Sequence, residues 1–406
     1  MDTYATILLW VIPGFLILVF IEILYGYYIK KQTYTLMDTI SSLSSGITNI
    51  LKDSMGIILI IISYPFLEKK IALFQLESSL TLYVIAFICI DFSSYWSHRL
   101  NHKINIFWNQ HIIHHSSEEF NLACALRQSI SNIIGYNALF LIPAAILGVP
   151  SEIIIFLSPI HLFGQFWYHT QHIGKLGFLE YIFVTPSQHR VHHAINPIYI
   201  DKNLSAIFCV WDRVFGTFQE ELDNVKPIYG TLKPVRTWNP IIINFQHFFR
   251  LAKDSWHTKK FSDKIKIWFM PTGWRPKDVE NLIKYKTQSK NQEKYYPNYT
   301  NLFKLVGVFH FLCVNTILTY FLYNFSDLQI DIKLIYTLII FLSVFGYSSL
   351  MDKYSWAPFF EVFRSLLSLY LINSIGEITS FKLFLYIYLF TSITISFLIL
   401  KKEESI

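Results

Sequence analysis

The chain has 406 residues and a formal net charge of +6, but only 15% of its residues are charged and 17% are aromatic. Because soluble domains carry about 25% charged residues, this composition excludes an ordinary soluble globular protein. No basic helix or RNA-binding aromatic motif accompanies the positive charge, which argues against a nucleic-acid partner. The four cysteines are far apart and none forms a CxxC pair, which excludes a disulfide framework and a zinc ribbon.

Long apolar stretches follow one another along the chain and predict an all-α, polytopic bundle of membrane helices. The first stretch contains a single charged residue, Glu22. The predicted membrane stretches are 8–28, 55–67, 80–96, 133–150, 153–168, 305–325, 334–351, 359–375 and 381–400. Basic pairs in the loops fit a positive-inside topology and contact with anionic lipid. We therefore expect an integral, multi-pass membrane protein.

Composition divides the chain into three regions. They are N-terminal membrane helices at 1–97, a histidine-rich catalytic region at 98–300 and C-terminal membrane helices at 301–406. The polar run at 286–298 predicts a loop and the second boundary. Inside the middle region, 133–168 predicts a helical membrane hairpin that breaks at Gly148, Val149 and Pro150.

Four histidines are not expected to bind a metal ion. The segment 245–260 alternates apolar and basic residues, so it is expected to lie in the headgroup plane, with His247 and His257 at the surface. His161 and His310 stand alone on apolar stretches, where a histidine is usually a hydrogen-bonded core residue.

Three histidine clusters need a different explanation. The clusters are HRLNH at 98–102, HIIHH at 111–115 and HRVHH at 189–193. If each cluster is helical, its imidazoles at i, i+3 and i+4 project from one face. Burying eight imidazoles together is costly unless each nitrogen has a partner, and metal ions are the natural partner of neutral imidazole. Eight ligands exceed one tetrahedral or octahedral site, so the pattern predicts two metal ions.

The spacing does not decide which metal binds. Carboxylate di-iron bundles use Glu and ExxH ligands, and a zinc metalloprotease uses HExxH; neither motif accompanies these clusters. A site built from histidines beside membrane helices suits iron that handles O2 next to a lipid, but zinc fits the ligand chemistry equally well.

The order HxxxH, HxxHH and HxxHH resembles the signature of the fatty acid hydroxylase/sterol desaturase superfamily. The text around the clusters, at 108–129, 165–177, 185–208 and 210–218, resembles the alkylglycerol monooxygenase branch, as does MPTGWRP at 270–276. The resemblance is dense over roughly 90–220 and thin at both ends. It implies a membrane di-iron monooxygenase, with its metal site in a cap at the cytosolic membrane face, that cleaves ether lipids with O2 and tetrahydrobiopterin.

The resemblance also implies the ligands. They are His98, His102, His111, His114, His115, His169, His189, His192 and His193. His172, close by in the chain, is a secondary candidate. Lys103 stands where the branch often has an acidic residue, which leaves the substrate and the reductant less defined than the metal site.

Carboxylates near the clusters are candidates for supporting roles. Asp91 lies seven residues before His98 in an apolar helix, and an intramembrane carboxylate is usually functional. We expect it to hydrogen-bond a ligand imidazole, with a helix end at the interface as the alternative. Glu118 and Glu119 follow HIIHH closely and can serve the same role or merely cap and solvate the segment.

These observations predict a membrane monooxygenase that hydroxylates a lipid C–H bond, next to the ether oxygen of an alkylglycerol. Its partners are a membrane lipid, O2 and a separate electron donor, either a pterin or a redox protein, because the flanking regions read as membrane helices and not as a haem domain. The enzymatic alternative is a sterol or fatty acyl hydroxylase or desaturase with a protein donor. The non-enzymatic alternative is a metal transporter or a haem electron-transfer protein, and a b-type haem leaves all but two histidines unexplained.

Overall fold

The computed structural model of the protein describes residues 2–285, 293–373 and 380–403. These residues are mostly helical, as the composition predicts. The helices before the third histidine cluster are α1 (Asp2–Tyr28), α2 (Leu36–Ser54), α3 (Tyr64–Ile71), α4 (Leu80–Lys103), α5 (Asn105–Trp108), α6 (Leu122–Ala125), α7 (Ile142–Ile146) and α8 (Ser151–Phe163). The remaining helices are α9 (Pro186–His192), α10 (Val210–Val214), α11 (Pro240–His257), α12 (Phe261–Phe269), α13 (Lys277–Leu282), α14 (Asn301–Tyr323), α15 (Ile330–Met351), α16 (Ala357–Asn373) and α17 (Ser380–Glu403). Residues 286–292 of the predicted boundary loop lie outside the described residues.

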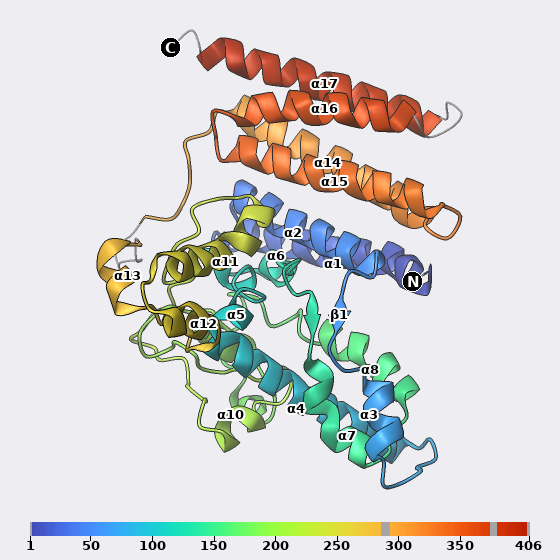
Figure 1. Ribbon diagram of the computed structural model, residues 1–406, viewed down its shortest axis with the longest axis vertical. Coiled ribbons are helices and arrows are strands. Elements are labelled where there is room, and N and C mark those ends of the chain that lie inside the picture. The colour runs from blue at the N-terminus through green and yellow to red at the C-terminus, as the bar shows by residue number, and fades with distance from the viewer. Residues whose placement is uncertain (1, 286–292, 374–379, 404–406) are drawn as a thin grey trace.

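Five of the described helices are long and apolar enough to cross a membrane. They are Ala5–Tyr28 in α1, Leu80–Lys103 (α4), Asn301–Tyr323 (α14), Ile330–Met351 (α15) and Ser380–Ile399 in α17. This set fits the predicted multi-pass integral membrane protein. Figure 1 shows α14–α17 side by side in one half of the molecule, with α1 and α2 packed against them.

Helix α2 is buried along much of its length although it is rich in serine. Its small side chains allow neighbouring helices to approach closely, and several of its hydroxyls find partners across the interface. Ser44 hydrogen-bonds the Tyr347 hydroxyl of α15, and Ser41 donates to the backbone carbonyl of Trp238 at 2.7 Å. The helix therefore joins the C-terminal bundle to the histidine-rich region.

Three predicted membrane stretches, 55–67, 133–150 and 153–168, do not form helices long enough to span a membrane. Residues 55–63 form no helix, and within them strand β1 (Leu59–Ile60) pairs in parallel with β2 (Ile134–Gly135), a feature that the all-α prediction lacks. Helix α3 then begins at Tyr64. The run 55–67 is apolar enough for a membrane helix but too short to span alone. Its β-branched isoleucines suit the extended pairing that the structure shows.

The predicted hairpin at 133–168 is only partly helical. Its break is correct, because Gly148 takes the left-handed conformation with φ +71° and the backbone of Phe74 lies against it. The first arm consists of a 3-10 helix (Asn137–Leu141) and the five-residue α7, and the second arm is α8, with 13 residues. Neither arm reaches the roughly 20 residues that a span needs.

The predicted stretch at 359–375 forms α16, whose last two predicted residues lie outside the described residues. This helix is shorter than the five candidate spans and buries an ion pair between Glu361 and Arg364 at 2.6 Å. It packs between α15 and α17, so the bundle shields its charges from lipid.

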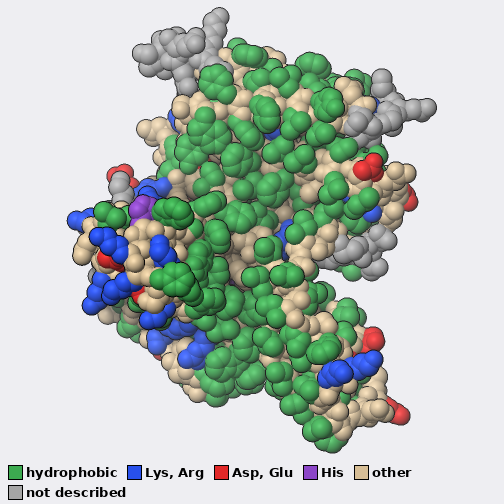
Figure 2. Space-filling view, viewed as in Figure 1, with side chains coloured by type: hydrophobic (Ala, Val, Ile, Leu, Met, Phe, Trp, Pro, Cys, Tyr) green, Lys and Arg blue, Asp and Glu red, His purple; other side chains and the backbone are tan. Residues whose placement is uncertain are grey.

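The histidine-rich region forms a cap at one end of the bundle. Helices α5 and α10–α13 build this cap, at the left of Figure 1, and α4 runs from it into the apolar part of the molecule. Figure 2 shows Lys and Arg side chains gathered over the cap, beside a broad hydrophobic surface over the helices. The charged end and the apolar body place the boundary between water and lipid near the base of the cap.

Candidate metal centre

Four segments carry the predicted ligands. His98 and His102 occupy the last two turns of α4, and α9 carries the third cluster behind the helix-starting Pro186. His169 lies in the loop after α8. The helix predicted for 111–115 is wrong: this segment is a series of tight turns that ends in a 3-10 helix, His114–Ser116. Consecutive turns still bring the three imidazoles of that segment close together.

The nine predicted ligands converge in two groups. In each group, one ring nitrogen of every histidine lies within 4.8 Å of the chosen ring nitrogens of all the other members. The five-histidine group contains His98, His102, His111, His115 and His192, and the four-histidine group contains His114, His169, His189 and His193. His172 belongs to neither group; its ring packs edge-on against Tyr25, with the ring centroids 5.3 Å apart.

Neighbouring histidines point into different groups. His114 belongs to the four-histidine group and His115 to the five-histidine group, and the two rings lie at 89° to each other. The same holds for His193 and His192, whose rings also lie at 89°. Each HxxHH segment therefore contributes to both groups, and the two groups share a wall.

Backbone carbonyls fix the tautomers of several rings. The Nδ1 atom of His98 lies 2.7 Å from the carbonyl of Leu204, and that of His192 lies 3.0 Å from the carbonyl of Lys202. The Nδ1 atom of His169 lies 3.1 Å from the carbonyl of Gln165. A carbonyl only accepts, so each Nδ1 carries the proton, and each Nε2 of the neutral ring presents a lone pair.

The lone pair of His169 faces another ring nitrogen. Its Nε2 atom lies 3.4 Å from Nε2 of His114, whose ring is also hydrogen-bonded to the backbone of Arg127. Two lone pairs repel at this distance unless a cation lies between them. In the other group, Nε2 of His98 lies 2.9 Å from Nε2 of His111. Nitrogens bound at right angles to one ion, about 2.1 Å from it, lie about 3.0 Å apart, so the spacing fits metal ligation.

Burial keeps the imidazoles outside the membrane helices neutral. Burial, and then repulsion from the neighbouring rings, lowers their pKa values well below the usual 6.5; these residues are His111, His114, His115, His189, His192 and His193. Burial likewise lowers the pKa of His169 to about 4. Neutral imidazole is the form that binds a metal ion, so the residues present fit the two-metal prediction.

Comparison with known proteins gives the family. A family model described as fatty acid hydroxylase matches residues 83–217, which contain all nine histidines. Alkylglycerol monooxygenase of Xenopus tropicalis is 34% identical over 368 residues, which cover 88% of this chain and 80% of that protein. The chain belongs to the alkylglycerol monooxygenase family. Alkylglycerol monooxygenase of Danio rerio is 32% identical over 90% of this chain and 82% of its own length.

The human alkylglycerol monooxygenase is 39% identical over 268 residues, and the match spans 65% of this chain but only 59% of that protein. An ornithine lipid hydroxylase of Rhizobium tropici is 28% identical over 135 residues, about a third of this chain. No solved structure matches the chain at a significant level. The predicted resemblance to the alkylglycerol monooxygenase family is confirmed.

Asp91 has a different set of contacts from the one predicted. Its carboxylate accepts hydrogen bonds from His161 Nε2 at 2.7 Å, from the backbone of Ile207 at 2.8 Å and of Phe208 at 3.1 Å, and from the Trp211 indole at 2.8 Å. None of these partners is one of the nine histidines. Asp91 therefore ties α4 and α8 to the segment that supplies the Leu204 carbonyl, and it explains why His161 lies in the core.

Asp201 and Asp212, which the sequence patterns do not single out, support two of the histidines. Asp201 lies 3.3 Å from Nδ1 of His102 and forms an ion pair with Lys103 at 2.7 Å. Although burial raises it, the contacts with His102 and Lys103 hold the pKa of Asp201 at about 2. Lys103, which stands where the family often has an acidic residue, thus orients the carboxylate of Asp201 from a distant part of the chain. Asp212 accepts the backbone N–H of Leu204 at 2.7 Å and that of Ser205 at 2.9 Å, and so orients the Leu204–Ser205 peptide, whose carbonyl bonds His98.

Glu22 connects the first membrane helix to the four-histidine group. Its carboxylate accepts the hydroxyl of Tyr34, the hydroxyl of Thr170 and, at 2.8 Å, the backbone N–H of Leu122. Thr170 directly follows His169. The signal for this role was present in the sequence, because Glu22 is the one charge in an otherwise apolar span.

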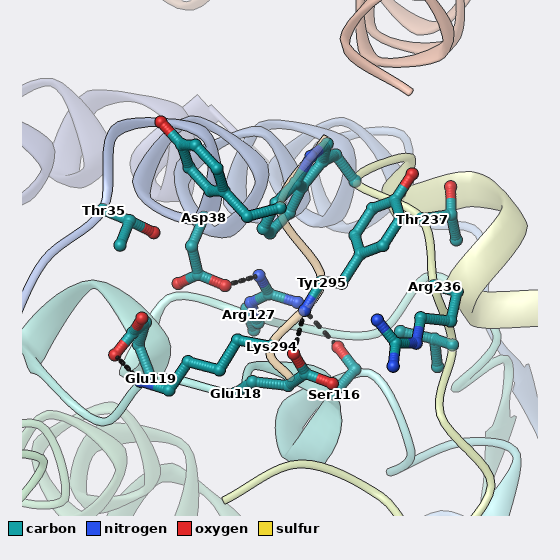
Figure 3. A pocket seen from close by; sticks show the side chains of 13 residues that line it. Thr35, Asp38, Ser116, Glu118, Glu119, Arg127, Arg236, Thr237, Lys294 and Tyr295 are labelled. Atoms are coloured by element: carbon teal, nitrogen blue, oxygen red, sulfur yellow. Dashed lines mark hydrogen bonds and ion pairs between the residues drawn. The ribbon is translucent and has the colours of Figure 1, made fainter. Parts of the chain in front are cut away.

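Behind the 114–119 segment lies a cavity of about 170 Å³, shown in Figure 3. Buried Arg127 forms an ion pair with Asp38 of α2 at 2.6 Å and donates to Ser116 at 2.7 Å. Ser117 donates to the same Asp38 carboxylate at 2.9 Å. This network attaches the residues that follow His115 to a membrane-side helix, so Asp38 and Arg127 hold the segment in place.

Glu118 and Glu119 line the same cavity and contact no histidine ligand. Glu118 accepts the backbone N–H of Tyr295 at 2.5 Å, and Glu119 forms an ion pair with Lys294 at 2.6 Å. Burial raises the pKa of both carboxyls. The two glutamates therefore join the segment to the start of the C-terminal region. His247, expected at the surface, is buried and bonds the carbonyl of Asn105 at 3.0 Å, whereas His257 is exposed as predicted.

Proposed function

We propose that the chain is a membrane di-iron monooxygenase that hydroxylates the carbon next to the ether oxygen of alkylglycerol lipids and thereby releases a fatty aldehyde. One observation supports it above all: nine imidazoles converge in two groups, in a chain of the alkylglycerol monooxygenase family. As a member of that family, the chain is an oxygen-dependent oxidoreductase.

In this proposal each histidine group holds one iron ion. His98, His102, His111, His115 and His192 hold the first ion, and His114, His169, His189 and His193 hold the second. Bound iron supplies the reduction of O2 and the oxidation of the C–H bond. Zinc suits imidazole equally well but has no redox chemistry, so the oxygenase activity of the family favours iron.

The overall reaction balances with one O2, two electrons and two protons for each lipid. One oxygen atom enters the C–H bond beside the ether oxygen and the other leaves as water. The resulting hemiacetal breaks at its carbon–oxygen bond, and its hydroxyl proton moves to the departing glycerol oxygen. The products are a fatty aldehyde and glycerol.

The residues around the histidines position the reaction and exclude water. Phe120 is fully buried, with its ring centroid 5.2 Å from that of His193 and 5.9 Å from that of His169. The Tyr168 ring packs 4.2 Å from His189. Because α4 carries its two histidines at the end of an apolar helix, the alkyl chain of the substrate can stay in the membrane while its ether carbon meets the site.

The decisive experiment is a product assay with purified protein in detergent. Alkylglycerol, O2 and reduced tetrahydrobiopterin should give fatty aldehyde and glycerol, and the ester-linked analogue should be inert because it lacks the ether-activated C–H bond. His192→Ala, which removes one member of the five-histidine group, is the matched inactive control. Metal analysis should find about two iron ions per chain.

A second candidate is hydroxylation of another lipid with a protein electron donor. The similarity to an ornithine lipid hydroxylase favours it. Turnover of an ornithine lipid, a sterol or a fatty acyl lipid with a ferredoxin-type donor, and none of alkylglycerol with pterin, would replace the ether-lipid assignment and leave the histidine site intact.

We further propose that the active site faces the cytosol, because the cap carries exposed basic pairs such as Lys259 and Lys260, between α11 and α12. All four natural cysteines are buried. A Lys259→Cys variant should therefore react selectively with a membrane-impermeant maleimide in inverted vesicles and not in right-side-out vesicles. The opposite labelling would place the cap on the other side.

A further inference from the structure

A groove lies between the cap and the membrane bundle, away from the histidines. Helix α11 forms one wall, and its first turn is attached to α15 because the Asn239 amide donates to the Phe345 carbonyl at 3.0 Å and to Ser349 at 2.8 Å. The opposite face of α11 is buried in the cap through residues such as Ile243 and His247. Besides residues of α11, the described residues that line the groove are Phe345 of α15 and Tyr285, which follows α13.

The groove is almost entirely hydrocarbon and has a volume of about 390 Å³. Ile241, Ile242, Phe245 and Phe249 of α11 line it, together with Phe345 of α15. Phe345 lies six residues before the end of α15 at Met351, or about 9 Å inside the end of this candidate span. The groove therefore opens at the depth where acyl chains meet the headgroups.

Positive charge gathers at the far end of the groove. Arg250 and Lys253 line it there, and Lys233 lies beside Arg250. No ion pair within 4.0 Å joins any of these three side chains to a carboxylate in the described ranges. The nearby Asp254 is already occupied by Arg275, at 2.5 Å and 2.9 Å. Burial, and then repulsion from Arg275 and Arg250, lowers the pKa of Lys233, which agrees with an excess of positive charge.

We propose that this groove binds one anionic phospholipid of the surrounding membrane, with an acyl chain along Ile241, Phe245 and Phe345 and its phosphate at Arg250 and Lys253. The polarity of α11 changes along its axis in the same order as that of a phospholipid. From Ile241 to Lys253 the helix rises about 18 Å, which is enough to accommodate a long acyl segment. Figure 2 shows the corresponding boundary between basic and hydrophobic surface at the cap.

Charge selects an anionic lipid over a zwitterionic one. A phosphate with no cation of its own gains from every Lys or Arg nearby, whereas a choline headgroup brings a positive charge to a place that already has an excess. Phosphatidylglycerol, an anionic lipid whose headgroup carries no cation, is therefore the probe of choice.

The test is native mass spectrometry of the delipidated full-length protein, titrated with phosphatidylglycerol or phosphatidylcholine of equal chain length. The wild type should bind one phosphatidylglycerol more tightly than phosphatidylcholine. Each cation near an anionic lipid is worth about fivefold in affinity, so Arg250→Gln with Lys253→Gln should weaken phosphatidylglycerol binding about thirtyfold. Phosphatidylcholine binding should hardly change.

The matched control is Lys69→Gln with Lys70→Gln, two exposed lysines at the end of α3. This variant removes the same charge and should bind phosphatidylglycerol like the wild type. Ile242→Trp, which fills the groove without altering charge, should weaken both lipids. Equal binding of the two lipids by the wild type, or equal losses in the two charge variants, would overturn the proposal in favour of general attraction to the basic surface. Preferential binding of alkylglycerol in the groove would overturn it in favour of a substrate site.

Discussion

Replacing Glu22 tests how the membrane helices hold the metal centre. The Glu22 carboxylate accepts three hydrogen bonds from part-buried or buried donors, and one of them, from Thr170, fixes the residue after His169. Glu22→Ala leaves all three donors without an acceptor. At about 1 kcal/mol for each lost hydrogen bond, the low end of the range for a buried donor, the cost is about 3 kcal/mol. If this cost destabilises only the metal-bound conformation, the four-histidine group binds its ion about 150-fold more weakly.

Glu22→Gln should be much milder, because the amide oxygen can still accept from Tyr34 and Leu122 while its NH2 group donates to the Thr170 hydroxyl, at a cost of about 1 kcal/mol. The measurement is metal per chain after dialysis against a chelator. Glu22→Ala should lose the ion of the four-histidine group and keep that of the five-histidine group. Glu77→Gln, at an exposed glutamate, should behave like the wild type. Equal metal retention in Glu22→Ala and the wild type would refute the reasoning.

The other predictions concern the two groups themselves. His192→Ala and His193→Ala should each abolish activity but weaken different ions, a difference that titrations of metal release can resolve; identical release curves would contradict the division into groups. His172→Ala should keep both ions and most of the activity, since its ring lies outside both groups. Asp91→Asn should lower the free energy of unfolding by about 1–3 kcal/mol, because one of the two buried oxygens that accept four hydrogen bonds becomes an NH2 donor, and should change metal affinity less than His192→Ala does. Metal retention should stay constant from pH 7.5 to about 5, because burial lowers the pKa of His169 to about 4 and neutral rings persist to that pH; loss centred near pH 6.5 would contradict it.

The sequence predicted which histidines come together better than how they divide into groups. Eight of the nine histidines lie in the two groups because the spacing within HxxxH or HxxHH is a local property that any tight turn or helix preserves, whereas His169 lies outside these motifs and is expected only from the family resemblance. The division into five and four was not predictable from the chain. It depends on which side of the 111–115 turns faces α4 and which faces the loop that carries His169, and these are long-range contacts.

Other errors have similar physical causes. The run 55–67 has the composition of a membrane helix, but a two-residue strand pairing with a segment about 75 positions later determines its conformation. His247 follows the amphipathic pattern of a surface helix, yet the carbonyl of Asn105 lies where its ring can bond in the interior. Asp91 was correctly singled out as a buried carboxylate. Its partners come from folding of the 207–211 segment, which periodicity cannot reveal.

The alternating assignment of neighbouring histidines has a structural consequence. The 111–115 segment and α9 contribute to both groups, so neither segment can move without disturbing both sites. The outer histidines are separate: α4 supplies His98 and His102 to one group only, and the loop with His169 belongs to the other. Each group is therefore attached to its own membrane helix, the first through α4 itself and the second through the Glu22–Thr170 hydrogen bond from α1. Two apolar helices thus hold the outer histidines of two groups whose inner histidines share one wall, which places the proposed chemistry where a lipid can reach it from the bilayer.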